Sequence, residues 1–292
     1  MATSSPAETS ANCRSPVTGL TVQALAPTSA ETTNTIARSS ILRIVYRIVK
    51  PLKMLMGLLP GGKALAAYYS RRRRARSLAP LGDMEGVFSH YFTVNKWKNA
   101  ESVSGVGSTF ENTQSIREAL PGLLRRLEVR SILDAPCGDY NWFRFVDRPK
   151  GIRYTGGDIV KALVLSNQQK YADETTAFIA LDIVHDALPR ADLWLCRDCM
   201  PHLAEELIVR AIKSFLRSDI RYLLTSVHPD CEANTDILTG DFRLLNLERL
   251  PFSFPPPLAR IDDSSKGLDR KYLGLWERDA LRRALESNDA FS

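Results

Sequence analysis

Residues 132–140 read ILDAPCGDY, an apolar run that ends in a tight turn with a single glycine. A buried strand, a tight turn and a following helix make up the cofactor site at the carboxyl edge of an open α/β sheet. Gly138 has no Cβ and would let the backbone approach a ligand closely. The full dinucleotide pattern G-x-G-x-x-G is absent, which weakens the pyrophosphate and P-loop interpretations and favours a cofactor without phosphates.

Short apolar runs alternate with amphipathic segments along most of the chain. The first predicted helix begins at a capping box, Ser108-Thr109-Phe110-Glu111, and Pro121 suits the first turn of a continuation. The predicted helices are 109–119, 140–147, 160–171 and 203–217. The predicted strands are 130–135, 153–158, 177–182, 191–197 and 220–227, followed by two near 258–262 and 271–276. This alternation predicts an α/β fold with a mostly parallel sheet, helices on both faces and an antiparallel hairpin at one edge.

Acidic residues end three consecutive predicted strands. Asp134 ends the first, Asp158 the second and Asp182 the third. An acid at the end of the second strand is placed to accept hydrogen bonds from ribose hydroxyls. Asp182 is a candidate acceptor for an adenine amino group. One such acid is unremarkable because Asp favours caps and turns, but three in succession indicate a nucleoside-binding edge.

Four segments, in order and spacing, resemble the successive motifs of class I S-adenosylmethionine-dependent methyltransferases. They are ILDAPCGDYNW, YTGGDIV, ALDIVHDALP and ADLWLCRDCMPHL. The match is nearest to a bacterial branch of unassigned acceptor, which the ESVSGVGST loop and the KYLGLWE strand also resemble, and it covers roughly residues 85–285.

The resemblance implies S-adenosylmethionine as cofactor and a role for each motif. Asp134 and Gly138 would border its methionine part, Asp158 would bind the ribose, and Asp182 with Ile183 would flank the adenine. Pro136, Ile159 and Arg197 complete the predicted cofactor site. The family's first motif usually has three glycines, whereas Pro136 and Tyr140 stand at the first and third of these positions here.

The fourth motif, residues 196–202, would lie at the methyl-donor end of the site in such a fold. Methyl transfer requires alignment of donor and acceptor and, for a hydroxyl acceptor, removal of a proton. Asp198 or His202 could be that base, and each could instead only cap or pack. Arg197 could contact the cofactor carboxylate or a carboxylated acceptor.

Several other residues near this edge have alternative interpretations. Cys196-x-x-Cys199 allows a zinc interpretation, but the pair is not repeated as in zinc ribbons, and we predict no metal. His185, Asp186 and His228 follow strand ends and could line an acceptor pocket.

Charge is distributed unevenly along the 292 residues. Residues 1–80 hold twelve of the 39 basic side chains but two of the 33 acidic ones, so this segment carries a formal charge of +10 and the rest −4. The acidic body argues against a nucleic-acid partner despite the basic total. Five cysteines are an odd number, which favours a reducing, cytoplasmic compartment over a disulfide framework.

The N-terminal part has two predicted regions ahead of a methyltransferase domain at 81–290. Residues 1–37 are rich in Ser, Thr, Ala and Pro and are expected to be disordered. Residues 38–80 form a basic helical extension in which an amphipathic helix around 41–58 precedes four consecutive arginines. This pattern, spanning 41–76, predicts peripheral contact with an anionic membrane; a helix packed on the domain and an organellar transit peptide are the alternatives.

The sequence therefore predicts a methyltransferase acting by O- or N-methylation on an acceptor that it does not identify. A catalytically inactive, membrane-associated binding protein with the same fold is the principal alternative. A nucleotide-dependent dehydrogenase is disfavoured by the missing glycine fingerprint.

Overall fold

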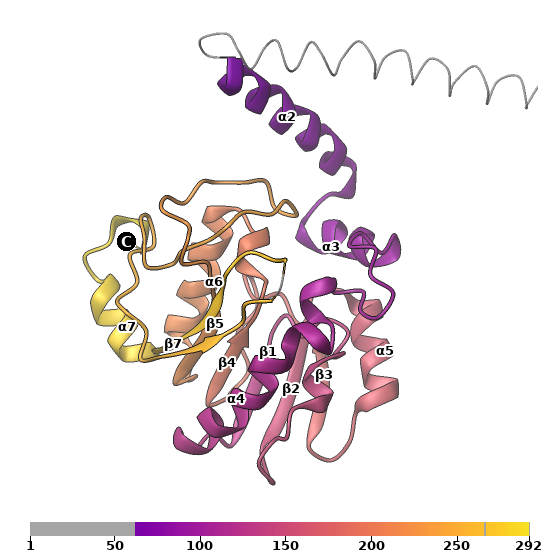
Figure 1. Cartoon of the computed structure of the whole chain (residues 1–292), viewed down its shortest axis with the longest axis vertical. Helices are drawn as coiled ribbons and strands as arrows, with labels where there is room; N and C mark the ends of the chain where they lie inside the picture. The colour runs from indigo at the N-terminus through magenta and orange to yellow at the C-terminus, as the bar shows by residue number, and fades with distance from the viewer. Residues whose placement is uncertain (1–61, 266, 292) are drawn as a thin grey trace, which may run out of the picture. The chain divides into compact units, whose positions relative to one another are not determined.

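The computed structural model describes residues 62–265 and 267–291. The chain divides into two compact units, Met1–Tyr68 and Tyr69–Ser292. Helix α2 (Gly62–Leu78) begins in the first unit, and all other described elements belong to the second (Figure 1). The predicted disordered segment and the predicted helix around 41–58 lie outside the described residues.

Seven strands form one sheet in the described part of the chain, in the order β3-β2-β1-β4-β5-β7-β6 (Figure 1). The strands are β1 (Ser131–Asp134), β2 (Arg153–Asp158), β3 (Thr176–Ala180), β4 (Leu193–Cys196), β5 (Tyr222–Val227), β6 (Ala259–Asp262) and β7 (Tyr272–Glu277). Strands β1 to β5 pair in parallel, while β7 is antiparallel to β5 and β6. This topology confirms the predicted α/β fold with a mostly parallel, Rossmann-like sheet and an antiparallel edge.

Helices cover both faces of this sheet, which explains why β4 is buried along its whole length. Along β4, Leu193 and Leu195 join one buried cluster, whereas Trp194 and Cys196 join the other. The longer helices are α3 (Met84–Thr93), α4 (Gln114–Arg126), α5 (Lys161–Tyr171), α6 (Glu205–Arg217) and α7 (Arg278–Leu285). Helix α4 contributes to the first cluster, and α6 and α7 contribute to the second. The period of two in β4 thus builds two cores, one on each face.

Two predicted helices differ from the structure. The segment predicted as a helix from 109 contains 3₁₀ turns first, and α4 begins at Gln114 and runs through Pro121. The capping box is wrong, because Thr113 occupies the N-cap position and makes no side-chain capping bond. The helix predicted at 140–147 is only a 3₁₀ turn, Phe143–Phe145. Tyr140 adopts a φ of 57°, a left-handed conformation that a regular helix does not allow.

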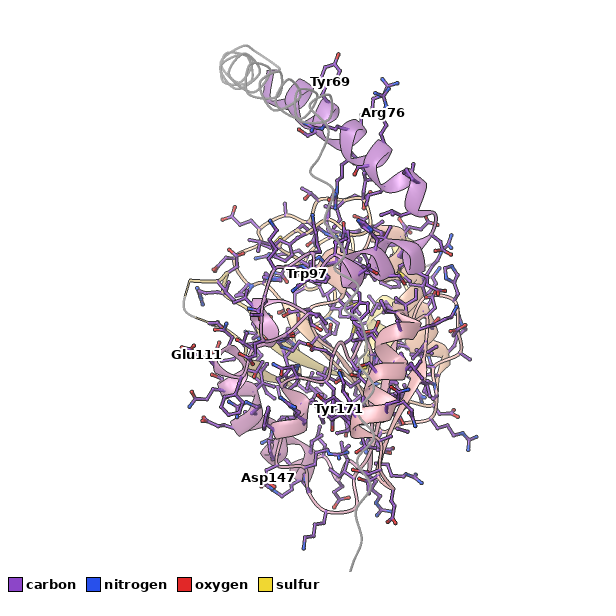
Figure 2. All side chains as sticks on the ribbon, turned by 90° about the vertical axis from the view of Figure 1, so that its right-hand side faces the viewer. Tyr69, Arg76, Trp97, Glu111, Asp147 and Tyr171 are labelled. Atoms are coloured by element: carbon purple, nitrogen blue, oxygen red, sulfur yellow. The ribbon has the colours of Figure 1, made fainter. Side chains whose placement is uncertain are left out.

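Helix α2 carries the arginine run of the predicted basic extension. Tyr69 and Arg76 are exposed on it (Figure 2), while Arg71 pairs with Asp236 at 3.1 Å and Arg74 with Asp241 at 2.6 Å. Two of the four consecutive arginines are therefore paired with acids of the folded body. Among the described residues, no helix has the length and apolar character needed to cross a membrane.

Candidate active site

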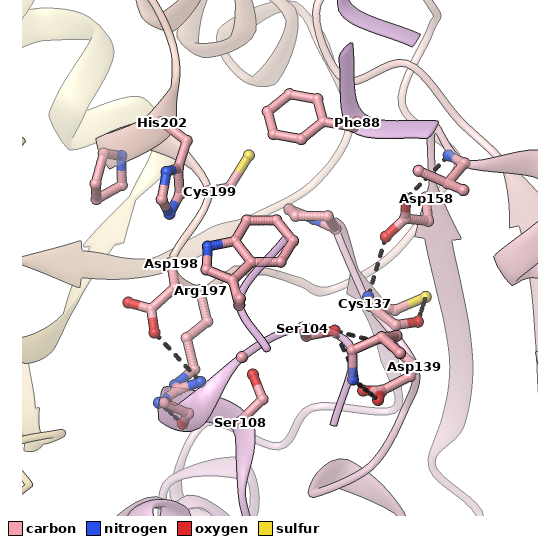
Figure 3. Close-up of a pocket in the computed structure, with 18 of the residues that line it drawn as sticks. Phe88, Ser104, Ser108, Cys137, Asp139, Asp158, Arg197, Asp198, Cys199 and His202 are labelled. Atoms are coloured by element: carbon pink, nitrogen blue, oxygen red, sulfur yellow. Dashed lines mark hydrogen bonds and ion pairs between the residues drawn. The ribbon is translucent and has the colours of Figure 1, made fainter. Parts of the chain in front are cut away.

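A cavity of about 460 Å³ lies at the carboxyl ends of β1, β2 and β4. The strand order reverses between β1 and β4, and an open α/β sheet binds its ligands at such a switch point. Figure 3 shows Arg197, Asp198 and His202 along one side of the cavity and Cys137 and Asp158 along the other. We call the side with Asp158, where the resemblance places the ribose of the cofactor, the donor end, and the side with His202, where the transferred methyl group would meet its acceptor, the acceptor end.

The turn after β1 is shaped by Gly138, which has a φ of 57°. A Cβ at this position would lie 2.2 Å from the Ser104 hydroxyl oxygen, so no other residue fits without a shift. Its N–H donates to Asp158 Oδ2 at 3.0 Å, and its carbonyl accepts from the Asn167 amide at 2.8 Å. The Ser104 hydroxyl makes this close approach in the structure, and the predicted close approach of a ligand to Gly138 stays a prediction. Pro136 and Gly138 both line the cavity.

Asp158 ends β2, and its carboxylate connects the turn after β1 with the turn after β2. Its Oδ1 accepts the Val160 N–H at 3.0 Å, in addition to the Gly138 bond at Oδ2. Burial raises the pKa of this carboxyl to about 6, although the backbone hydrogen bonds oppose the shift. The group is therefore ionised at neutral pH, and each oxygen keeps a lone pair for a further donor. Ile159 lines the cavity beside it.

Asp134 ends β1 and is only 2% exposed. The Tyr154 hydroxyl donates to its Oδ2 at 2.7 Å. Burial raises the pKa of Asp134 to about 7, against the opposing effects of the Tyr154 hydrogen bond and the charge of Arg197. A buried carboxyl with so high a pKa borders a cavity in which a cation would stabilise its charged form.

The third predicted acid lies elsewhere. Asp182 follows β3 and is not among the residues that line the cavity, whereas its neighbours Leu181 and Ile183 are. Its carboxylate accepts the Val184 N–H at 2.8 Å and pairs with Nδ1 of His185 at 2.8 Å. The structure therefore brings Asp134 and Asp158 together at the cavity and leaves the Asp182 side chain in the loop beyond it.

Arg197 follows β4 and is held in a buried ionic network. Its Nε and Nη2 donate to the two carboxylate oxygens of Asp263, at 2.9 and 2.8 Å, and Nη2 also donates to the Gly107 carbonyl at 2.8 Å. Burial alone would lower the pKa of this guanidinium, but Asp263 and Asp198 outweigh it and raise the pKa. Arg197 borders the cavity with its charge already compensated, so its visible role is to hold neighbouring segments in place.

Asp198, one of the two predicted bases, belongs to the same network. It pairs closely with Lys271 Nζ, lies 3.4 Å from Arg197 Nη1 and accepts from the Ser226 hydroxyl at 3.2 Å. Burial favours the neutral acid, but Arg197 and Lys271 outweigh it and hold the pKa of Asp198 well below its usual range. A carboxylate stabilised in this way is a weak base.

His202, the other predicted base, lies in the 3₁₀ turn Met200–His202. Its Nδ1 lies 2.8 Å from the Asp241 carbonyl oxygen, which can only accept, so Nδ1 carries the proton. Nε2 therefore keeps its lone pair in the neutral ring. Burial lowers the pKa of His202, so the ring is neutral at pH 7. These properties are those of a general base with an orienting partner.

A second histidine, His228, follows β5 and also lines the cavity. Its Nδ1 accepts the Leu245 N–H at 3.3 Å, so its Nε2 carries the proton in the neutral ring. Burial lowers its pKa as well. The sequence indicated this residue only as one of several loop side chains near the sheet edge.

The loop at residues 102–108 borders the cavity and is fastened by Asp139. The Asp139 carboxylate accepts the Ser102 hydroxyl at 3.0 Å, the Val103 N–H at 2.9 Å and the Ser104 hydroxyl at 3.2 Å. This loop is the ESVSGVGST segment that was noted in the sequence only for its resemblance.

The charged residues Asp139, Asp263 and Lys271 take part in the networks of the site but have no role in the sequence-based prediction. Lys271 precedes β7, at the start of the KYLGLWE segment, and Asp263 follows β6. Asp139 and Lys271 lie in segments that carried the resemblance, whereas Asp263 had no signal, because nothing in local spacing connects residues 263 and 271 with the end of β4. No group of His, Cys, Asp and Glu with metal-binding geometry occurs in the described ranges, where Cys196 and Cys199 are free thiols.

No family model and no curated protein matches this chain. Solved structures do match, with low identity. Human N-acetylserotonin methyltransferase in complex with S-adenosylmethionine has 15% identity and a TM-score of 0.42 over 56% of this chain and 50% of its own. Magnesium protoporphyrin IX methyltransferase from Synechocystis PCC 6803, with bound S-adenosylmethionine, has 14% identity and a TM-score of 0.45 over 66% of this chain and 96% of its own.

A third match is the 1,6-didemethyltoxoflavin-N1-methyltransferase of Burkholderia thailandensis, crystallised with S-adenosylhomocysteine. It has 18% identity and a TM-score of 0.44 over 56% of this chain and 78% of its own. The chain thus spans half the length of the human enzyme and more of the other two. The reaction and the substrate are therefore inferred from the residues of the site.

Proposed function

We propose that the chain is an S-adenosylmethionine-dependent methyltransferase that methylates a hydroxyl or amine of a small acceptor. The observation that carries the proposal is the set of side chains that line the cavity at the switch point of the sheet. Two buried acids from adjacent strand ends border this cavity, and a histidine with an unprotonated Nε2 borders its other side.

The donor end has the groups that a charged nucleoside requires. Asp158 is fixed by two backbone N–H groups and is ionised at neutral pH, so it can accept hydrogen bonds from ribose hydroxyls. Leu181 and Ile183 supply apolar surface for a purine. The full pyrophosphate-binding glycine pattern is missing from the turn, which favours a nucleoside without phosphates.

Asp134 supports a donor that carries positive charge. Burial raises the pKa of this carboxyl, so its surroundings disfavour the carboxylate, and a cation beside it would reverse that preference. S-adenosylmethionine supplies an electrophilic methyl group on a cationic sulfonium. Asp134 would stabilise a cationic group of this donor and hold it near the acceptor end.

His202 is the stronger candidate of the two predicted bases. The Asp241 carbonyl fixes its tautomer and leaves Nε2 free to take the acceptor proton as the oxygen–methyl bond forms and the carbon–sulfur bond breaks. Asp198 instead remains paired with Lys271 and Arg197, and its role is to keep those cations in place.

Calorimetric titration with S-adenosylhomocysteine tests the donor end. Asp158→Ala should weaken binding by about 1–3 kcal/mol, the cost of leaving buried polar partners unpaired. The matched control is Asp219→Ala, because Asp219 forms only an exposed surface pair with Arg190. Overlapping titrations of the wild type and Asp158→Ala would remove Asp158 from the site, and absence of binding by the wild type would contradict the proposed function.

A further inference from the structure

The acceptor end contains a continuous row of four rings: Trp97, His202, Phe242 and His228. Ring centroids are 6.0 Å apart between Trp97 and His202, 5.4 Å between His202 and Phe242, and 5.9 Å between Phe242 and His228. All four line the cavity, although they come from four separate segments of the chain. Trp97 follows α3 and is labelled in Figure 2.

One segment, residues 240–245, sets the protonation pattern of both histidines. The Gly240 N–H donates to the His202 carbonyl at 2.8 Å, and the Asp241 carbonyl accepts from His202 Nδ1. The Leu245 backbone N–H donates to Nδ1 of the His228 ring. The Leu245 carbonyl accepts the backbone N–H of His228 at 2.8 Å. These partners favour opposite tautomers of the two rings.

Opposite tautomers give the acceptor end one hydrogen-bond acceptor and one donor. His202 offers the lone pair of Nε2, whereas His228 offers an Nε2–H. No described residue hydrogen-bonds to either Nε2 atom, and neither is among the fully buried unpaired polar atoms of the described ranges. Each nitrogen therefore keeps some accessible surface, and both side chains line the cavity, where a ligand could contact them.

Two aromatic side chains in the row are incompletely covered by protein. Trp97 is 38% exposed and Phe242 is 52% exposed, so part of each ring is left uncovered. Phe88 and Phe92 also line the cavity from α3. Aromatic walls of this kind favour a planar ligand, because offset or edge contacts with another ring add to the burial of apolar area.

The charges of the acceptor end are paired. Lys271 contacts both Asp198 and Asp263, and Arg197 contacts the same two acids. Asp269 adds a negative charge to the lining. This wall therefore offers no uncompensated cation for a carboxylated or phosphorylated acceptor. The cavity volume lies within the range of small-molecule sites, and the cavity must hold both the donor and the reacting group of the acceptor.

We propose, on the basis of the function proposed above, that the acceptor is an uncharged aromatic compound with a hydroxyl and a second oxygen on neighbouring ring atoms. The hydroxyl donates to His202 Nε2 and the neighbouring oxygen accepts from the His228 Nε2–H, while the ring lies against Phe242 and Trp97. His202 receives the hydroxyl proton as the oxygen–methyl bond forms, and the electron pair of the breaking carbon–sulfur bond goes to sulfur.

The test is calorimetric binding of simple probes to the full-length protein saturated with S-adenosylhomocysteine. Catechol carries both proposed features, phenol lacks the second oxygen, and cis-1,2-cyclohexanediol lacks the aromatic ring. Salicylate adds a charge. We expect catechol to bind most tightly, each of the other probes to bind at least about tenfold more weakly, and catechol with S-adenosylmethionine to release S-adenosylhomocysteine.

Variants then assign the contacts. His228→Phe removes the donor and should weaken catechol binding about tenfold without changing the binding of phenol. Phe242→Ala should weaken both aromatic probes. The controls are His90→Ala and Phe145→Ala, since both side chains are exposed and neither lines the cavity.

The outcomes separate this inference from the proposed function. Failure to bind S-adenosylhomocysteine would contradict the methyltransferase itself. Normal binding of S-adenosylhomocysteine with no catechol binding, with equal affinity for cyclohexanediol, or with a preference for salicylate would overturn the aromatic acceptor alone. An unchanged catechol affinity in His228→Phe would remove the histidine pair from acceptor recognition.

Discussion

The two ends of the cavity are built in different ways. The donor end consists of residues at the ends of adjacent strands, Asp134 and Asp158, and of the turn between β1 and the next helical segment. The acceptor end collects side chains from the segments after α3, β4, β5 and β6 and before β7. A parallel sheet brings the first set together by its topology alone, whereas only the full tertiary structure assembles the second. The donor end is therefore generic to the fold, and the acceptor end is particular to this chain.

The sharpest way to separate the two ends is to remove the proposed base. His202→Phe deletes Nε2 at the acceptor end and should lower turnover about 10²–10⁴-fold, the usual contribution of general base catalysis. The donor end is untouched, so S-adenosylhomocysteine affinity should stay unchanged. A rate assay with catechol as the methyl acceptor measures turnover, and calorimetry measures the affinity for S-adenosylhomocysteine. Equal losses in turnover and donor affinity would mean that the two ends are not separable at His202.

Breaking the ionic network should reduce stability. Asp263→Asn leaves Arg197 and Lys271 with one acid between them, and removing one partner of a buried ion pair costs about 3–5 kcal/mol. Chemical denaturation measures this loss. Asp279→Asn, at an exposed pair with Arg282, is the control and should change stability little. A stability loss of similar size in both variants would show that the network is not the structural basis of the acceptor end.

Replacing Asp134 should raise stability, whereas replacing Asp263 should lower it. Its pKa is raised in the folded state, so the contribution of this group to folding is fully present below its unfolded pKa and is lost as the pH rises through about 7. Each pKa unit corresponds to about 1.4 kcal/mol, so Asp134→Asn should stabilise the free protein at pH 8 by up to a few kcal/mol and less at pH 5.

The same substitution should weaken the binding of S-adenosylmethionine, because Asn cannot balance a cation. Thermal melts at the two pH values and calorimetry at pH 8 check both effects. A variant that is destabilised at pH 8 and still binds S-adenosylmethionine normally would show that Asp134 is an ordinary structural acid.

Lowering the pH should weaken donor binding in the wild type. Asp134 and Asp158, with pKa values of about 7 and about 6, become protonated between pH 8 and 5 and lose the charge that favours a cation. The affinity for S-adenosylmethionine should fall more than that for S-adenosylhomocysteine, because only the former has a charged sulfonium. Parallel titrations over this range test the prediction, and identical pH profiles would contradict a charge-based role for these acids.

The smallest effect is expected at the helix that carries the arginine run. Arg74→Ala removes a half-exposed pair with Asp241 and a hydrogen bond to the Tyr91 hydroxyl, and should change stability by about 1 kcal/mol. Asp241 holds His202 through its carbonyl oxygen, so turnover should change little. A large loss of turnover with unchanged stability would show that α2 takes part in positioning the acceptor end.

The difference between the two ends also explains what the sequence could predict. Strand alternation and the acids after β1 and β2 are local patterns, so β2 was predicted with the bounds that the structure has, and Asp134 and Asp158 both lie at the cavity. The same rule predicted Asp182 at the site. However, β3 ends at Ala180, and the Asp182 carboxylate accepts a backbone N–H of the loop that follows. A local rule identifies a strand end but not the direction in which its loop turns.

The acceptor end had no comparable local signal. The pairing of Asp198 with Lys271, 73 positions away, is what makes Asp198 a weak base, and no spacing rule reveals it. The tautomer of His202 depends on a carbonyl in the 240–245 segment. The helix predicted at 140–147 failed for a related reason, since the buried aromatic side chains of Tyr140 and Phe143 pack into the core from an irregular turn.

The most direct test of the central claim is calorimetric titration of the wild-type protein at pH 8 with S-adenosylmethionine and, separately, with NAD. A donor end with two strand-end acids and without the pyrophosphate-binding glycines should bind S-adenosylmethionine with one-to-one stoichiometry and micromolar affinity, and should not bind NAD. Binding of NAD without binding of S-adenosylmethionine would contradict the account.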